Sequence, residues 1–133
     1  MIDSRLSNAP YARFLGVRFD GEGDALMGVL PFAAHLIGNT SLPALHGGVL
    51  GGFMEIVALA RLAADRPGEP LAKPIDINVE YFRPAGPRET YARAEVRRAG
   101  RRVANVRVEA WQADAAKPVA ALHGHFLLSP AEG

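Results

Sequence analysis

The fold of this chain is decided by one stretch, Leu45-His46-Gly47-Gly48-Val49-Leu50-Gly51-Gly52-Phe53-Met54-Glu55-Ile56-Val57-Ala58-Leu59-Ala60. From position 47 to position 60 every residue is apolar or glycine except Glu55, and Pro43 and Pro67 stand on either side. This pattern predicts one buried helix that contains a single carboxylate. An uncompensated buried carboxylate costs several kcal/mol, so Glu55 is predicted to be paired, exposed at a cleft or part of a mechanism. The plainer alternative is a hydrogen bond to a neighbouring backbone group.

The composition bounds the size and class of the protein. Its 133 residues, 49% of them hydrophobic, suffice for one core, so a single domain over residues 1–133 is predicted. Fifteen basic and fourteen acidic residues give a net charge of +1, which argues against general nucleic-acid binding. Cysteine is absent, which excludes disulfides and thiolate chemistry. No signal-peptide core and no apolar run of about 18 residues is found, so a cytoplasmic protein that does not enter a membrane is expected.

The residues before the long helix predict a short helix, two strands and a loop. The short helix is expected to start at Ser7-Asn8-Ala9-Pro10, with Pro10 near its first turn, and to stop at Gly16. Residues 17–20 and 25–30 are typical of two strands joined by a tight turn. Residues 32–45 have no clean period and are rich in loop formers. A loop that can carry functional groups is therefore predicted beside the long helix.

Beyond the long helix the apolar period changes from helical to two. Strands are predicted over residues 75–82, 89–97, 103–111 and 119–128. The whole pattern is an α+β layout, in which an antiparallel meander of five to six strands wraps around one long central helix. A wrapping sheet is expected because a helix that is apolar all round must be covered on more than one side.

Three motifs of this chain occur together in a known family. His46-Gly47-Gly48-Val49 is followed by Glu55, a strand Ile77-Asn78-Val79-Glu80-Tyr81-Phe82-Arg83-Pro84 comes about twenty residues later, and a Gly100-Arg101-Arg102 hairpin precedes a closing apolar strand. Over about residues 10–128 the chain resembles the hotdog-fold acyl-CoA thioesterases of the phenylacetate-pathway type. The resemblance implies a hotdog fold, hydrolysis of an acyl-CoA thioester, and a homodimer or dimer of dimers (a homotetramer). It implies no metal and no cofactor apart from the CoA of the substrate.

The chemistry of the reaction points to two residues. Thioester hydrolysis needs an attacking oxygen, from a carboxylate or from water that it activates, and donors where negative charge develops on the carbonyl oxygen. Glu55 is the candidate for the first role and the amide of Gly47, at the helix start, for the second. Eight residues of helix separate them by about 12 Å, whereas both must lie within about 3 Å of one reacting group. A two-fold dimer with antiparallel helices is predicted to bring Gly47 of one subunit to Glu55 of the other.

Two polar residues near the helix start are predicted to assist. The resemblance implies a polar amide upstream of the histidine, for which Asn39 is the nearest match, with Thr40 or Ser41 as alternatives. His46 is expected to orient the helix start and not to act as a general base. Gly48 is predicted to allow the helix and the ligand to approach closely.

Further residues are candidates for holding the substrate. Phe82, together with Tyr81, Phe53 and Met54, suggests an apolar pocket for a medium-chain or aryl acyl group. Arg101, in a hairpin rich in arginine, is either part of a solvated turn or a contact for the CoA phosphates.

Three other positions have competing roles. Arg83 is a comparable candidate for the CoA phosphates. His123 and His125 share one face of a strand, but no further spacing completes a metal site, so a structural role is expected.

Two other functions compete with thioester hydrolysis. The segment His35-Leu36-Ile37-Gly38-Asn39-Thr40 is loosely similar to the histidine loop of the hotdog acyl hydratases and dehydratases, although it lacks their phenylalanine-proline pair. The third reading is a protein that binds acyl-CoA or an aromatic ligand without turnover. In that case Glu55 would tune affinity and not rate.

Overall fold

The computed structural model describes residues 4–7, 9–39, 44–45 and 47–128 of the chain. It contains two short helices, one long helix and eight strands. In chain order these are α1 (Ser4–Ser7), α2 (Pro10–Leu15), β1 (Arg18–Asp20), β2 (Met27–Leu30), β3 (Ile37–Asn39), β4 (Ala44–Leu45), α3 (Gly47–Asp65), β5 (Lys73–Tyr81), β6 (Thr90–Ala99), β7 (Val103–Trp111) and β8 (Ala120–Leu127).

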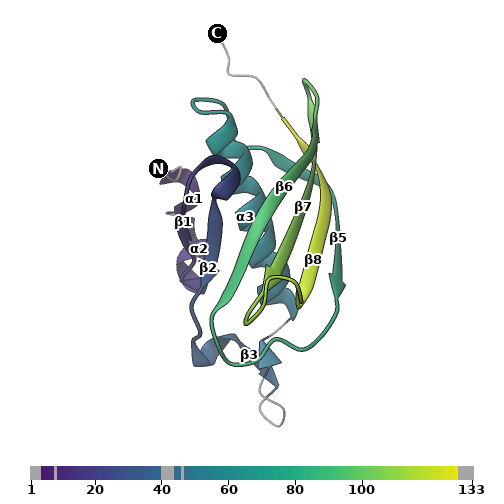
Figure 1. Ribbon diagram of the computed structural model, residues 1–133. Coiled ribbons are helices and arrows are strands. Elements are labelled where there is room, and N and C mark those ends of the chain that lie inside the picture. Colours follow the sequence, from purple (N-terminus) through teal and green to yellow (C-terminus); the bar gives the residue numbers. More distant parts are fainter. Residues whose placement is uncertain (1–3, 8, 40–43, 46, 129–133) are drawn as a thin grey trace.

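Six of the strands form one antiparallel sheet, and α3 lies across one face of it (Figure 1). The strand order is β1-β2-β6-β7-β8-β5. The predicted α+β fold with one long helix on an antiparallel sheet is confirmed, but the simple meander order is wrong. Because α3 stands between β2 and β5 in the chain, the backbone crosses the sheet along the helix. As a result β5 joins the opposite edge, beside β8.

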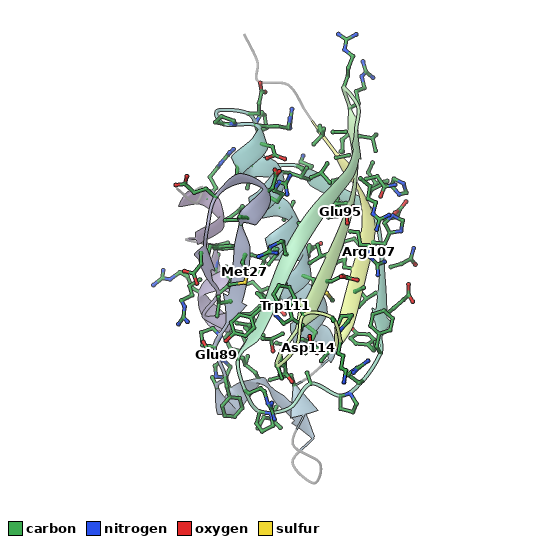
Figure 2. All side chains as sticks on the ribbon, in the orientation of Figure 1. Met27, Glu89, Glu95, Arg107, Trp111 and Asp114 are labelled. Atoms are coloured by element: carbon green, nitrogen blue, oxygen red, sulfur yellow. The ribbon has the colours of Figure 1, made fainter. Side chains whose placement is uncertain are left out.

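The sheet has one face toward α3 and one face that is mostly polar. Figure 2 shows Glu95, Arg107 and Trp111 on the face turned away from α3. Their neighbours along the strands point the other way, so Val106 and Val108 are fully buried. This alternation of buried and exposed positions is the period of two that predicted the strands.

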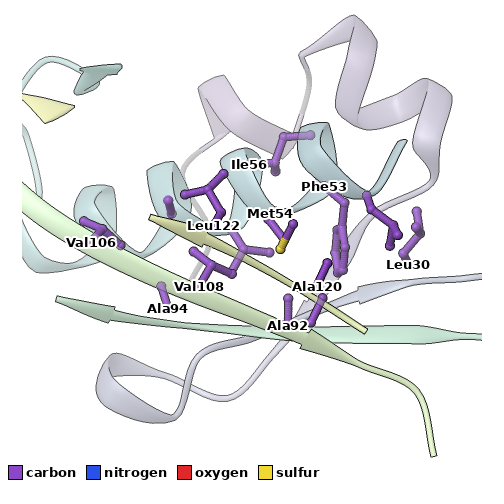
Figure 3. Packing of buried hydrophobic residues seen from close by; sticks show 14 of the residues in the cluster. Leu30, Phe53, Met54, Ile56, Ala92, Ala94, Val106, Val108, Ala120 and Leu122 are labelled. Atoms are coloured by element: carbon purple, nitrogen blue, oxygen red, sulfur yellow. The ribbon is translucent and has the colours of Figure 1, made fainter. Parts of the chain in front are cut away.

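The core lies between α3 and the inner face of the sheet. Phe53 and Met54 are fully buried and point from α3 into a layer of small and branched side chains (Figure 3). Ala92 and Ala120 of the sheet are among the small residues of this layer, and they let the aromatic ring of the helix sit close to the backbone. Phe53 and Met54 therefore belong to the core of the single chain, and their prediction as part of an acyl pocket is wrong.

The long helix is not covered on all sides. Gly48, Gly51, Gly52, Glu55 and Leu59 are partly or fully exposed, and their spacing places them along one side of α3. The predicted buried helix therefore has one open side in the single chain, and Glu55 lies on that side. By length and composition α3 would also suit a membrane span, with a mean hydropathy of 1.5, but 50% of its apolar window is buried inside the fold. It is used here as a core helix.

The segments before α3 follow the sequence predictions in part. The short helix α2 ends at Gly16, whose φ of 76° is left-handed, and β1 and β2 form the expected pair. Of the loop predicted over residues 32–45, residues 40–43 lie outside the described part, and the rest contains regular structure. It contains a 3₁₀ turn over Ala34–Leu36 and the pair of short strands β3 and β4.

One charged side chain in the second half of α3, that of Arg61, is nearly buried. The side chain of Arg61 is 13% exposed. Its Nη1 donates to the carbonyl oxygen of Ala94 at 3.1 Å, its Nη2 to Asp24 at 3.3 Å and its Nε to Asp65 at 3.1 Å. The pairing of β2 with β6 ends at Arg93. The carbonyl oxygen of the next residue, Ala94, therefore has no partner in β2, and Arg61 supplies its hydrogen-bond donor.

Replacing Arg61 by leucine is expected to lower the free energy of unfolding by about 2–3 kcal/mol, because the variant leaves the Ala94 carbonyl without this partner. Urea unfolding followed by the fluorescence of Trp111 measures the change. Arg18→Leu is the matched control, since it removes an ion pair to Glu89 whose two side chains are 60% and 43% exposed. Its effect is expected to stay within about 1 kcal/mol. Equal losses in the two variants would contradict this role of Arg61.

Candidate active site

Gly47 is the first residue of α3. At this position the backbone N–H has no partner within the helix, and the aligned peptide dipoles make the helix start positive. The first turn carries no acidic side chain that would compete for these N–H groups. The helix start can therefore donate a hydrogen bond to an oxygen that gains negative charge.

An apolar hollow of about 310 Å³ opens beside this helix start. It is formed by the end of β4, the start of α3 and the segment that follows β5. Its lining consists of Leu45, Gly47, Leu50, Tyr81, Phe82, Arg83, Pro84 and Ala85. Among the described residues of this lining, Arg83 is the one that carries a charge. The structure thus brings the predicted substrate residues Phe82 and Arg83 together with Gly47.

A second hollow, of about 340 Å³, adjoins the first, since Arg83 and Pro84 line both. Its lining is cationic: Arg83, Arg88 and Lys117 face one carboxylate, that of Asp114. Within the described part of the chain none of the three cations forms an ion pair. An apolar cavity and a positively charged cavity therefore lie next to each other at the start of α3.

Gln112 holds the wall of the cationic hollow in place. Its side chain lies near the end of β7, accepts a hydrogen bond from the Gly86 N–H and donates one to the Gly86 carbonyl oxygen, both at 2.9 Å. These two bonds tie the segment between β5 and β6 to the neighbouring turn.

Glu55 lies on the open side of α3, about two helical turns after Gly47. Its carboxylate makes no hydrogen bond or ion pair with the described residues, so the alternative of a backbone-bonded structural carboxylate finds no support there. The helix rise still separates it from Gly47 by about 12 Å. One chain therefore does not bring the two groups to the same reacting carbonyl.

The other predicted site residues are not gathered at this place in one chain. The backbone of Asn39 belongs to β3, but its side chain lies outside the described part, as does all of His46. Gly48 is exposed on the open side of α3. Arg101 is exposed at the turn between β6 and β7, whereas Tyr81 pairs at the other end of the sheet (Figure 1). Arg101 is thus remote from Gly47 of the same subunit.

The two histidines of β8 lie on the outer face of the sheet. His123 Nε2 donates to Asn105 Oδ1 at 2.7 Å, and His125 Nδ1 donates to Asp76 Oδ1 at 2.9 Å. The hydrogen bond from His125 holds the pKa of the Asp76 carboxyl below its usual value. In the ranges that the structure describes, no three histidine or carboxylate side chains are grouped closely enough to hold a metal ion.

Sequence reasoning missed three residues at this end of the molecule, Arg88, Lys117 and Tyr11, and it named Tyr81 only as part of an apolar pocket. Arg88 and Lys117 reach the cationic hollow from two different connections of the sheet, and no local pattern marks them. Tyr11 and Tyr81 contact the first turn of α3 through their hydroxyl groups. The glycines of α3 indicate that another group approaches the helix closely, but they do not indicate that this group is a tyrosine.

Comparisons with known proteins agree with this architecture. Residues 42–119 match the family model of the thioesterase superfamily. A protein of Chromobacterium violaceum is 38% identical, over 97% of this chain and 90% of that chain, with a TM-score of 0.76. The PaaI protein of the E. coli phenylacetic acid degradation operon shares the fold at 18% identity, over 95% of this chain and 88% of that one, with a TM-score of 0.81. A comparison with proteins of curated function returned no significant match.

Proposed function

The chain belongs to the thioesterase superfamily, and on that premise we propose that it hydrolyses acyl-CoA thioesters with medium-chain or aryl acyl groups to the free acid and CoA. The observation that carries the proposal is the pair of adjoining hollows at the start of α3. One is apolar and contains Gly47, and the other is cationic. An acyl-CoA has matching parts, an apolar acyl group and a nucleotide that carries a diphosphate and a 3′-phosphate.

The proposed reaction uses Gly47 and Glu55 in complementary roles. The carbonyl oxygen of the thioester accepts a hydrogen bond from the Gly47 N–H, which stabilises the negative charge of the tetrahedral intermediate. Glu55 either takes a proton from water, whose oxygen then attacks the carbonyl carbon, or attacks that carbon itself. The carbon–sulfur bond then breaks and CoA leaves as the thiolate. In the second route water hydrolyses the resulting anhydride.

A homodimer is part of the proposal, because one chain holds the two groups too far apart. The exposed edge of β5 supports it. This edge strand has nine residues, against three in β1 at the other edge, and an unpaired edge is a template for pairing with another chain. Ile75 and Tyr81 of β5 are 56% and 54% exposed. Two-fold pairing of β5 strands would set two α3 helices antiparallel on one face, and a dimer of dimers could be built from such pairs.

The cationic hollow is proposed to bind the phosphates of CoA. Replacing both Arg88 and Lys117 by glutamine is expected to raise KM for an acyl-CoA about tenfold, the effect of about 1.4 kcal/mol of lost binding. The kcat is expected to stay within about twofold, because neither residue reaches the thioester. When the same acyl group is carried by N-acetylcysteamine, which has no phosphate, the double variant is expected to have the same KM as the parent. Release of free thiol from short, medium and aryl acyl thioesters measures each value.

The matched control removes the same charge at the far end of the sheet. Arg101→Gln with Arg102→Gln is expected to leave KM unchanged. A rise in KM in this pair, and not in the first, would place the phosphates at the β6–β7 turn. If the parent released no thiol from any acyl-CoA, the proposed function would be wrong, and hydroxyacyl and enoyl substrates would be examined next. His35, on which a dehydratase would depend, lies with its Nε2 3.1 Å from the Phe14 carbonyl oxygen.

A further inference from the structure

The first two turns of α3 consist largely of residues that form helix poorly. Glycine occupies positions 47, 48, 51 and 52 of a helix that begins at residue 47, and glycine is among the least helix-favouring residues. The N–H groups of a first turn also lack intrahelical partners. A helix start of this kind needs support from outside the helix if one of its N–H groups is to keep a fixed direction.

Tyr81, from the end of β5, supplies one such support. Its hydroxyl group donates to the carbonyl oxygen of Gly47 at 2.8 Å. The hydroxyl end of the ring lies against the first two turns of α3. A Cβ atom at Gly47 would lie 3.4 Å from the Tyr81 hydroxyl oxygen, and one at Gly51 would lie 3.7 Å from it. Both distances are ordinary van der Waals contacts, so the Tyr81 ring packs closely against the helix start at Gly47 and Gly51.

Tyr11, from α2, lies against another part of the same helix start. Its hydroxyl group is 3.5 Å from the carbonyl oxygen of Gly48. A Cβ atom at Gly52 would lie only 2.5 Å from a carbon of the Tyr11 ring, so the ring requires glycine at that position. Elements from two separate parts of the chain therefore contact consecutive carbonyl groups at the start of α3. The bond from Tyr81 is the shorter one.

We propose that Tyr81 is a positioning residue of the thioesterase site. By holding the carbonyl group of Gly47, it keeps the first turn of α3 in the direction in which the Gly47 N–H meets the substrate oxygen, and Tyr11 is a weaker brace. The inference rests on the proposed function. A donor stabilises a developing oxyanion only if it is aimed before the reaction, and small misplacements lower the rate strongly. Tyr81 acts through the backbone of Gly47 and exchanges no proton with the substrate.

The test is Tyr81→Phe, which keeps the ring in the apolar hollow and removes only the hydroxyl group. The kcat for acyl-CoA hydrolysis is expected to fall about tenfold while KM stays within about twofold. Hydrogen exchange of the backbone amides of residues 47–54 is expected to become faster, because the first turn opens more often. Tyr11→Phe is expected to change both quantities less. The matched control is Tyr91→Phe, whose ring packs near Trp111 on the outer face of the sheet, and it is expected to behave as the parent.

Two readouts keep this inference separable from the proposed function. Parental kcat and parental exchange in Tyr81→Phe would overturn the positioning role and leave the thioesterase proposal intact. A fall in kcat with unchanged exchange would also overturn it, since Tyr81 would then act on the substrate directly. A parent that released no thiol would overturn both, whereas faster exchange in Tyr81→Phe together with a selective loss of kcat supports the inference.

Discussion

The Glu55→Gln variant is expected to hydrolyse acyl-CoA about 10² to 10⁴ times more slowly than the parent, the range typical of losing a general base. Glutamine has nearly the same shape but can neither accept the proton of water nor attack the thioester carbon. Free-thiol release under single-turnover conditions, with saturating enzyme, measures the chemical step. It does so without a contribution from product release.

The same substitution is expected to leave stability almost unchanged. Glu55 has no hydrogen-bond partner in the described chain, so its replacement removes no internal contact, and the free energy of unfolding is expected to stay within about 0.5 kcal/mol of the parent. Glu22→Gln, at an exposed position between β1 and β2, is the matched control for loss of one carboxylate. A Glu55→Gln enzyme with near-parental rate would remove Glu55 from the mechanism in either of its two roles.

The elements of the fold were predictable because each has a local cause. The apolar run that ends at Ala60 and the alternation over residues 103–111 determine a helix and a strand without reference to the rest of the chain. The strand order was not predictable in the same way, since the position of β5 depends on the path of α3 across the sheet. The exposure of Glu55 also depends on which side of the helix the sheet leaves open.

The residues of the candidate site that lie within a single sequence motif were predictable. Gly47 was found from its motif, and Phe82 and Arg83 from theirs, and the structure places the three around one hollow. Arg88 and Lys117 come from different connections and meet only through the packing of the sheet. The roles of Glu55, His46 and Asn39 stay predictions, and the side chains of the last two lie outside the described residues.

The Gly47→Pro variant is expected to lower kcat by about 10² to 10³, the loss measured when an oxyanion donor is removed. Proline has no N–H, so it deletes the proposed donor itself. It is also well tolerated at the first position of a helix, which Gly47 occupies. Its ring begins in space where a Cβ would lie 3.4 Å from the Tyr81 hydroxyl oxygen. Far-UV circular dichroism checks that α3 is kept, and a folded variant with parental kcat would contradict the role of the Gly47 amide.

Mixing the two inactive variants decides whether the site is shared between subunits. If Glu55 of one subunit serves the Gly47 of its partner, refolding equal amounts of Glu55→Gln and Gly47→Pro chains gives half heterodimers, each with one intact and one doubly defective site. About a quarter of the parental activity should then return, by counting the combinations in a two-fold dimer. Each variant refolded alone should stay inactive. If both groups acted within one chain, no combination would contain an intact site, so the mixture would stay inactive too.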